Sequence, residues 1–284
     1  MALMKVKDIL QHATENHYGV AAVNTFNYES VMWVAEAAKR EKIPVIIQLY
    51  PGYESYISLH HVASFAKEFA ENADVPIAVH LDHSATYEIA TRGIKAGFPS
   101  VMVDGSSKPY EENVAMTQAV VRTASVFGVD VEAELGHVGS GANLDDIINS
   151  DNYTNVAQAV EFVERTGCGS LAVAVGNAHG AYVQTPKLDF DRIKQLRASV
   201  PVPLVLHGCS DIPHEQLQES VRLGMSKFNI ATEYFRACSA SIAKVAAEGN
   251  YRGDYCTMLK QSSEDAIEFV RSKMRLLNPN GFSL

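Results

Sequence analysis

Residues 77–84, with the sequence Ile-Ala-Val-His-Leu-Asp-His-Ser, decide how the rest of the chain is interpreted. The apolar run 77–79 leads directly into His80, Asp82 and His83, and a helical pattern follows. Strand residues alternate between the faces of a sheet, so His80 and Asp82 share a face, and we expect the chain to leave the sheet near His83. Reactive groups of parallel α/β proteins gather at such strand ends. The stretch is either an active-site strand or a strand with histidines satisfied in the core, and similar strand ends elsewhere favour the first.

Short apolar runs alternate with segments of helical periodicity along the whole chain. Apolar residues recur at i, i+3, i+4 and i+7 in 62–69 and 156–163, as in amphipathic helices. Near-continuous apolar strands alternating with such helices predict a parallel sheet covered by helices. Eight such strand–helix units favour an α/β fold of the closed (β/α)8 TIM barrel type over an open doubly wound sheet. The first strand is not followed by GxGxxG, which argues against a dinucleotide-binding doubly wound sheet. The predicted strands are 20–26, 44–49, 77–82, 100–104, 130–136, 170–174, 203–208 and 227–231.

The ends of the chain predict additional helices. We expect an N-terminal helix over 6–17 and two closing C-terminal helices after about Thr232. No linker, low-complexity segment or charge run divides the sequence, so a single barrel domain over 1–284 is predicted. Residues 139–152 are rich in Gly, Ser, Asn and Asp and form the longest non-periodic stretch. They predict either a mobile active-site loop or a long surface connection.

Composition narrows the class of protein. The 284 residues are 47% hydrophobic, and the net charge of -9 without a basic stripe argues against nucleic-acid binding. The four cysteines form no CxxC pair, which favours a reduced compartment. The N-terminus lacks an apolar signal core, and no apolar run reaches the roughly 18 residues of a membrane span. These features predict a cytoplasmic protein without a membrane or nucleic-acid partner.

Histidines follow three different predicted strands at their carboxyl ends. His83 follows the third strand, His179 the sixth and His207 the seventh. All carboxyl ends of a barrel face one mouth, so we expect these side chains to converge there. Three histidines with an open position are typical of a catalytic zinc site. Asp104 and Glu134, at the ends of the fourth and fifth strands, either orient these ligands or offer an alternative metal position.

Two strand ends have the pattern of an anion site. Residues 206–210, Leu-His-Gly-Cys-Ser, lead from the seventh strand into a turn, and residues 229–232, Asn-Ile-Ala-Thr, end the eighth strand at a helix. These loops bind phosphate in many barrels, through backbone N–H groups at a helix N-terminus. Cys209 has a second interpretation as a reactive thiol or a fourth metal ligand, although no base or resolving cysteine stands beside it.

The position of the lysines indicates which chemistry would activate a ketone. Only Lys227 lies within a predicted strand, near the start of the eighth strand and therefore far from the mouth, which disfavours a Schiff base. A metal ion can instead stabilise an enediolate by several kcal/mol as a Lewis acid. Together with the anion loops, this predicts carbon–carbon cleavage beside a phosphorylated ketone.

Ordered motifs along nearly the whole chain resemble the class II ketose-bisphosphate aldolases, in the subgroup of bacterial tagatose-1,6- and fructose-1,6-bisphosphate aldolases. The resemblance implies a zinc-dependent enzyme that reversibly cleaves a ketose 1-phosphate or 1,6-bisphosphate to dihydroxyacetone phosphate and an aldehyde. The motifs are HLDH at 80–83, VDGS at 103–106, EENVAMT at 111–117, EAELG at 132–136, VGNAHG at 175–180, PLVLHG at 203–208 and NIATE at 229–233.

The resemblance also implies roles for individual residues. His83, His179 and His207 would hold Zn²⁺, and Asp82 would move the proton on the C4 oxygen. A monovalent cation, Na⁺ or K⁺, is implied near the phosphate, and a homodimer or homotetramer is the expected assembly. The residues implied to bind the dihydroxyacetone phosphate half are Gly180, Gly208, Cys209, Ser210, Asn229, Ile230, Ala231 and Thr232.

Four positions depart from the family pattern. Asp211 lies in the phosphate turn, where it would repel a dianion unless it turns away to cap the following helix. Tyr50 replaces a small hydroxyl residue at the end of the second strand, and Ser84 replaces a Gly or Ala. The loop after the fifth strand lacks the usual proton-exchanging glutamate, so Asp145, Asp146 or a water is expected to substitute for it.

Two other functions remain open from the sequence. One is a barrel metal hydrolase, in which zinc activates water instead of a ketone. The other is a non-catalytic or poorly active aldolase-like subunit that stabilises a partner. The departures in the phosphate turn favour the subunit, whereas the three histidines and Asp82 favour the enzyme.

Overall fold

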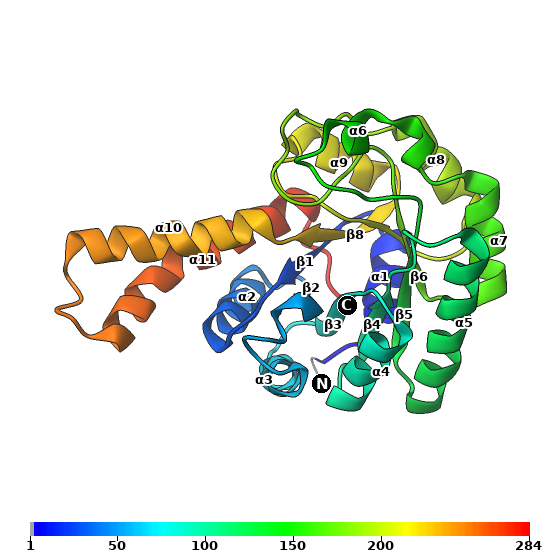
Figure 1. Ribbon diagram of the computed structural model, residues 1–284. Coiled ribbons are helices and arrows are strands. Elements are labelled where there is room, and N and C mark those ends of the chain that lie inside the picture. The colour runs from blue at the N-terminus through cyan, green and yellow to red at the C-terminus, as the bar shows by residue number, and fades with distance from the viewer. Residues whose placement is uncertain (1–2) are drawn as a thin grey trace.

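A computed structural model describes residues 3–284 and shows eight parallel strands closed into a barrel (Figure 1). Each strand pairs with its neighbour in the chain, and β8 pairs with β1 to complete the circle. The predicted (β/α)8 barrel and all eight predicted strands are therefore confirmed. The strands are β1 (Val20–Asn24), β2 (Val45–Leu49), β3 (Ile77–Ser84), β4 (Ser100–Val103), β5 (Asp130–Leu135), β6 (Ser170–Val173), β7 (Leu204–Leu206) and β8 (Met225–Ile230).

Helices surround the barrel and extend both ends of the chain. The predicted N-terminal helix and the two closing helices are present, although α1 ends at Glu15 rather than at residue 17. The stretch 139–152 contains the short helix α6 and runs into a 3-10 turn, so it is not wholly irregular. The helices are α1 (Val6–Glu15), α2 (Tyr28–Glu41), α3 (Leu59–Glu71), α4 (Tyr87–Ala96), α5 (Tyr110–Phe127), α6 (Leu144–Ile148), α7 (Val156–Thr166), α8 (Phe190–Ser199), α9 (His214–Arg222), α10 (Thr232–Glu248) and α11 (Tyr255–Leu277), with 3-10 turns η1 (Pro51–Tyr53) and η2 (Ser150–Asn152).

The main core lies between the strands and the surrounding helices. The apolar stripe of α3 places Val62 and Ala66 in this core, and that of α7 contributes Ala159 and Val163. Outward-facing strand residues complete the layer, because alternate residues of a barrel strand point outward. This packing fixes the strands, and with them the positions of their carboxyl ends.

Helix α1 closes the amino-terminal end of the barrel. Its Ile9 and Leu10 are fully buried and cluster with Ala22, Ile46 and Ala78 of the strands. The floor of the barrel is therefore apolar. The polar side chains discussed below accordingly belong to the carboxyl ends and the central interior.

Helices α10 and α11 form a hairpin that projects away from the barrel (Figure 1). Helix α11 returns along α2, and Arg40 of α2 pairs with Glu264 of α11 at 2.7 Å. Arg271 of α11 pairs with Glu41 of α2 at 2.6 Å. No helix in the described part of the chain is both long and apolar enough to cross a membrane.

Candidate active site

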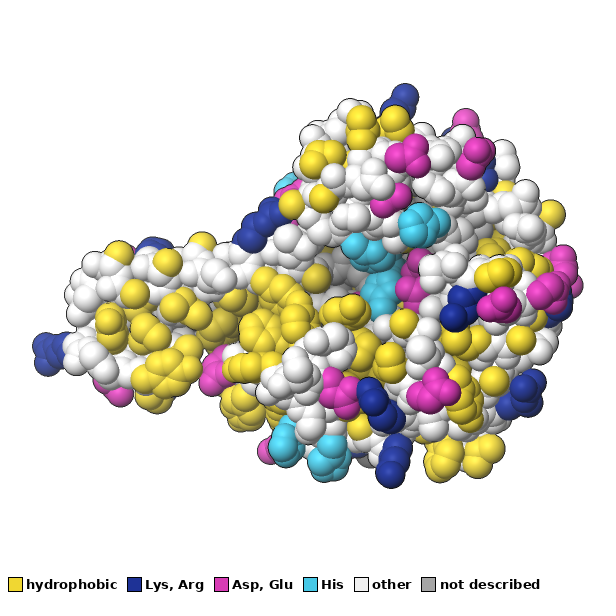
Figure 2. All heavy atoms as spheres, viewed as in Figure 1, with side chains coloured by type: hydrophobic (Ala, Val, Ile, Leu, Met, Phe, Trp, Pro, Cys, Tyr) yellow, Lys and Arg dark blue, Asp and Glu magenta, His cyan; other side chains and the backbone are white. Residues whose placement is uncertain are grey.

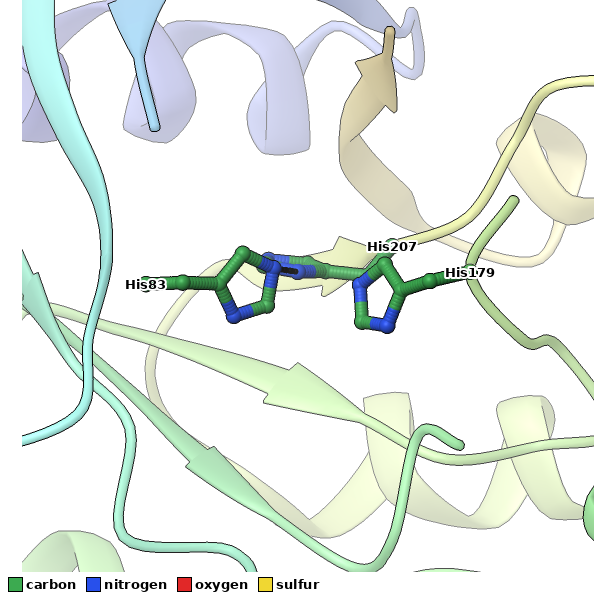
Figure 3. Close-up of side chains that lie close together, drawn as sticks. All are labelled: His83, His179 and His207. Carbon is green, nitrogen blue, oxygen red and sulfur yellow. Dashed lines mark hydrogen bonds between the residues drawn. The ribbon is translucent and has the colours of Figure 1, made fainter. Parts of the chain in front are cut away.

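Three histidine rings meet at the carboxyl end of the barrel. Figure 3 shows His83, His179 and His207 turned toward one another from three different segments. The ring centroids of His83 and His179 lie 4.7 Å apart, and those of His83 and His207 lie 4.5 Å apart. One nitrogen from each ring lies within 4.8 Å of the other two. The structure therefore brings together the three histidines selected from the sequence.

The second nitrogen of each histidine is held by an acceptor elsewhere in the protein. The three pairs are His83 Nδ1 with Asp104 Oδ2 at 2.9 Å, His179 Nδ1 with the Val138 carbonyl at 3.2 Å, and His207 Nε2 with Glu132 Oε1 at 2.9 Å. Such outer partners fix the ring orientation of metal-binding histidines. The remaining nitrogens face one another, and His179 Nε2 is buried without a partner. This donor set fits a zinc ion with three nitrogen ligands and an open position.

An irregular strand end places both Asp82 and His83 at the mouth. The pairing of β3 with β4 shifts between Leu81 and Ser84, and His83 has a φ of +38°. Strict alternation would point neighbouring side chains to opposite faces. The prediction that the chain leaves the sheet near His83 is confirmed, because β3 ends at Ser84, the next residue. The distorted backbone turns His83 inward.

The protonation of the histidines follows from their surroundings. Burial lowers the pKa of His83, but Asp82 and the hydrogen bond to Asp104 outweigh it and raise the pKa to about 9. Burial, together with the nearby His83, lowers the pKa of His179 to about 4 and that of His207 well below its ordinary value. Charged His83 thus donates from Nε2 to His207 Nδ1 across 2.8 Å. A bound cation would take the place of that proton.

Asp82 is a buried carboxylate held by three amide side chains. Asn24 and Gln48 donate to Oδ2 at 2.9 and 3.2 Å, and Asn229 donates to Oδ1 at 3.1 Å. Burial alone raises the pKa of Asp82, but His83 and other nearby positive groups and the Asn24 hydrogen bond bring it to about 2. Asp82 Oδ1 lies 4.0 Å from His83 Nε2. An ionised proton acceptor therefore stands beside the histidine cluster.

Asp104 and Glu134 differ in their relation to the histidines. Asp104 orients His83, and it also accepts hydrogen bonds from the Ser106 backbone and hydroxyl. Glu134 Oε2 is buried without a partner and lies 3.8 Å from His207 Nδ1. Burial and the neighbouring Asp104 raise the pKa of Glu134 well above its ordinary value. Glu134, Asp104 and His83 also form a second group whose ligand atoms lie close enough to hold a metal.

The group that orients His207 is Glu132, which the sequence reasoning missed. Glu132 also accepts hydrogen bonds from Lys227 Nζ at 2.8 and 3.0 Å, and both side chains are fully buried. Lys227 therefore faces Glu132 inside the barrel and not the mouth. The inward position of Glu132 could have been predicted from the sequence. Residues i and i+2 of a strand share a face, so Glu132 points inward if Glu134 does.

The predicted anion site is partly assembled. Gly180, Gly208, Ser210, Ala231 and Thr232 line the cavity together with Asn229. Helix α10 begins there without a side-chain cap, so backbone N–H groups of its first turn face this end of the cavity. The Glu233 N–H of that turn already donates to Ser210 Oγ at 3.3 Å.

Cys209 and Ile230 do not line the cavity, in contrast to the expectation that they contact the phosphate. The Cys209 N–H donates to the Asn229 carbonyl at 3.1 Å, and its thiol donates to the Leu206 carbonyl at 3.1 Å. Burial raises the pKa of the Cys209 thiol, which disfavours a reactive thiolate, and Cys209 belongs to none of the possible metal-binding groups of the described residues. The Ile230 side chain is buried in the core. The Cys209 N–H and the Ile230 side chain are therefore both used within the protein and do not face the cavity.

Asp211 turns away from the anion site, but it does not cap the following helix as expected. Both of its oxygens accept hydrogen bonds from Arg236 of α10 at 2.8 Å, and α9, whose N-cap residue is Pro213, begins at His214 without a side-chain cap. Asp211 is absent from the cavity lining. The charge of Asp211 is thus neutralised outside the site.

The two loop aspartates lie away from the cavity. Asp145 is exposed on α6, and Asp146 accepts a hydrogen bond from the Ser140 N–H at 2.7 Å. Neither residue lines the cavity in this structure. A role for either in proton exchange stays a prediction.

The cavity occupies about 410 Å³ above the histidines. Figure 2 shows histidine side chains at the bottom of a hollow, bordered by hydrophobic side chains on the side of the α10–α11 hairpin. Tyr50, Tyr53 and Ala85 line the part that belongs to the ends of β2 and β3. Sequence reasoning noted Tyr50 but missed Tyr53.

Comparisons with known proteins agree with this geometry. The family described as fructose-bisphosphate aldolase class-II matches residues 4–282. The protein YdjI of Escherichia coli (strain K12) is 38% identical over 269 residues, which are 95% of each chain. A crystal structure titled as the YdjI aldolase from that organism superposes with a TM-score of 0.86, 34% identity and coverage of 97% of both chains. A crystal structure of a proposed fructose-1,6-biphosphate aldolase from Coccidioides immitis gives a TM-score of 0.84 with 28% identity over 96% of both chains.

Proposed function

This chain belongs to the class II fructose-bisphosphate aldolase family, and on that premise we propose that it is a zinc-dependent aldolase. Its reaction is the reversible cleavage of a ketose 1-phosphate or 1,6-bisphosphate to dihydroxyacetone phosphate and an aldehyde. The single observation that carries the proposal is the set of three convergent histidine nitrogens beside the ionised Asp82.

The residues of the proposed site have two roles: some would bind the zinc ion, and Asp82 would transfer a proton. His83, His179 and His207 would hold the zinc ion, and Asp104, the Val138 carbonyl and Glu132 keep the rings in position. Bound zinc supplies Lewis-acid polarisation of a ketone oxygen. A hydrolase would require a base aimed at a metal-bound water, and the family membership favours the aldolase.

Asp82 accepts the proton of the C4 hydroxyl in the cleavage direction. As the proton leaves, the C4 oxygen becomes the aldehyde carbonyl and the C3–C4 bond breaks, leaving its electron pair on C3. The amide groups of Asn24, Gln48 and Asn229 hold the carboxylate in one orientation for this transfer. In the condensation direction Asp82 returns the proton to the new C4 oxygen.

The anion site is assigned to the phosphate of dihydroxyacetone phosphate. Gly180, Gly208, Ser210 and the uncapped start of α10 support this assignment, because backbone N–H groups at a helix N-terminus stabilise negative charge. A monovalent cation beside this phosphate, a cytoplasmic location and a homodimer or homotetramer belong to the same proposal.

Release of dihydroxyacetone phosphate from a panel of ketose phosphates tests the proposal. Purified protein with one zinc per chain should cleave at least one member of the panel. Full zinc occupancy without turnover of any member would contradict the aldolase and favour the non-catalytic subunit.

A further inference from the structure

Within residues 3–284, the part of the cavity that receives the aldehyde half has no lysine or arginine in its lining, and its positive charge belongs to the histidine cluster alone. The charged side chains in the cavity lining other than histidine are Asp82 and Asp104. A second phosphate would enter as a dianion and meet two carboxylates. Like charges brought together in this way disfavour binding.

Three basic side chains near the barrel mouth are paired with carboxylates, and Lys108 and Lys187 of the loops after β4 and β6, which are unpaired in the described part of the chain, do not line the cavity. None of these basic residues lines the cavity, so none is placed to meet a phosphate there. The three pairs are Arg92 with Glu54 at 2.5 Å, Arg236 with Asp211 at 2.8 Å, and Lys273 with Glu233 at 2.6 Å.

Two tyrosines occupy the place where the tail of the substrate would leave the histidines. The Tyr50 ring stands edge-on to His83 with 6.4 Å between centroids, and edge-on to Tyr53 at 5.8 Å. Tyr50 folds over Gly52, where an added Cβ would lie 2.2 Å from Cε1 of the ring. The absence of a side chain at Gly52 therefore permits this position of Tyr50. Phenol rings and hydroxyls suit the carbon backbone and hydroxyls of an uncharged sugar chain.

We propose that the substrate is a ketose 1-phosphate whose aldehyde half is an uncharged polyhydroxylated chain, with Tyr50 determining this specificity. The inference rests on the proposed aldolase function and narrows its substrate class. The phosphate end lies at the loops after β7 and β8. The tail lies over the ends of β2 to β4, on the opposite side of the closed barrel.

Two measurements test the aldolase function and the proposed aldehyde specificity separately. Exchange of the hydroxymethylene proton of dihydroxyacetone phosphate into D₂O, followed by NMR, needs no aldehyde. Condensation is then measured with glyceraldehyde and with glyceraldehyde 3-phosphate. We expect exchange, and a kcat/KM for glyceraldehyde at least about tenfold higher than for its phosphate. Equal or better use of the phosphorylated aldehyde would overturn this inference alone. Neither exchange nor condensation with either aldehyde would overturn the aldolase function and the inference with it.

A matched pair of variants tests the role of Tyr50. Tyr50→Arg adds a cation in the cavity lining, and Tyr56→Arg adds the same charge at an exposed tyrosine outside the lining. Tyr50→Arg should shift the ratio of kcat/KM values about tenfold toward the phosphorylated aldehyde, while Tyr56→Arg should leave it unchanged. Retained proton exchange would show that each variant is folded. An equal shift in both variants, or none in Tyr50→Arg, would remove Tyr50 from this role.

Discussion

Asp82 keeps its charge at a position where burial alone would favour the neutral acid. Its three amide donors and the nearby His83 maintain the carboxylate that the proposed proton transfer needs. Asp82→Ala should therefore reduce turnover about 10²- to 10⁴-fold, as expected for loss of a positioned proton acceptor. Zinc content should not change, since Asp82 is not one of the three nitrogen ligands.

Steady-state kinetics and metal analysis of Asp82→Ala provide the measurement. Asp74→Ala, which removes a carboxylate from an exposed position, is the control and should match the unaltered protein. Near-normal turnover of Asp82→Ala would remove the proposed proton transfer from this residue.

His83 is expected to make metal binding at the three histidines dependent on pH. The pKa of about 9 in the folded, metal-free protein lies above the ordinary value of 6.5. The stabilisation from charged His83 is therefore complete below pH 6.5 and is lost as the pH rises through 9. A metal must displace this proton, so its apparent affinity should rise about tenfold per pH unit between pH 7 and 8.

Competition with a chelator at pH 7 and 8 measures this dependence. His179 and His207 are already neutral there because burial lowers the pKa of each, so one proton is displaced per metal bound. A metal affinity that does not change between these pH values would contradict the assignment of the displaced proton to His83.

At the scale of elements, the turn after β7 depends on Gly208. Its φ is +62°, and an added Cβ would lie 2.0 Å from the carbonyl oxygen of Ala178 in the loop after β6. Gly208→Ala should therefore destabilise the fold by about 1–3 kcal/mol and raise the KM for dihydroxyacetone phosphate, because the backbone at the anion site must move.

Gly249 offers a matched control in the same backbone region. Its φ is +69°, but an added Cβ meets nothing within 4 Å. Gly249→Ala should show the backbone penalty of about 1 kcal/mol without a change in KM. Chemical denaturation and steady-state kinetics compare the two variants. If Gly208→Ala and Gly249→Ala changed stability and KM equally, the close approach of the Ala178 carbonyl to Gly208 would not be the cause of the effect at Gly208.

The strand ends explain how much of the site could be predicted from sequence. Apolar runs followed by histidines were enough to place His83, His179 and His207 at one mouth, because all carboxyl ends of a closed barrel converge. The inward turn of His83 was not predictable, since it depends on a register shift between β3 and β4. The partnership of Glu132 with His207 and Lys227 joins three strands, and no local pattern specifies it.

The same limit applies to Asp211. The sequence places its carboxylate in the phosphate turn, and only the approach of α10 supplies Arg236 as its partner. Cys209 was expected at the anion site because its neighbours are there, but its N–H is used by the Asn229 carbonyl. Contacts between segments distant in the chain thus decide which residues of a correctly located loop face the cavity.

At the scale of the whole molecule, the α10–α11 hairpin projects from the barrel and exposes apolar groups such as Tyr255. We expect these surfaces to be covered in a homodimer or homotetramer. Light scattering on the purified protein should therefore give two or four times the chain mass of 31.0 kDa. A mass of one chain at micromolar concentration would contradict this expectation.

The dependence of carbon–carbon cleavage on metal tests the central claim most directly. Protein stripped with a chelator should lose the release of dihydroxyacetone phosphate, and zinc should restore it with an endpoint at one ion per chain. His207→Ala should bind zinc more weakly and fail to recover, because it lacks one of the three converging nitrogens. Undiminished cleavage by the stripped protein would contradict the account.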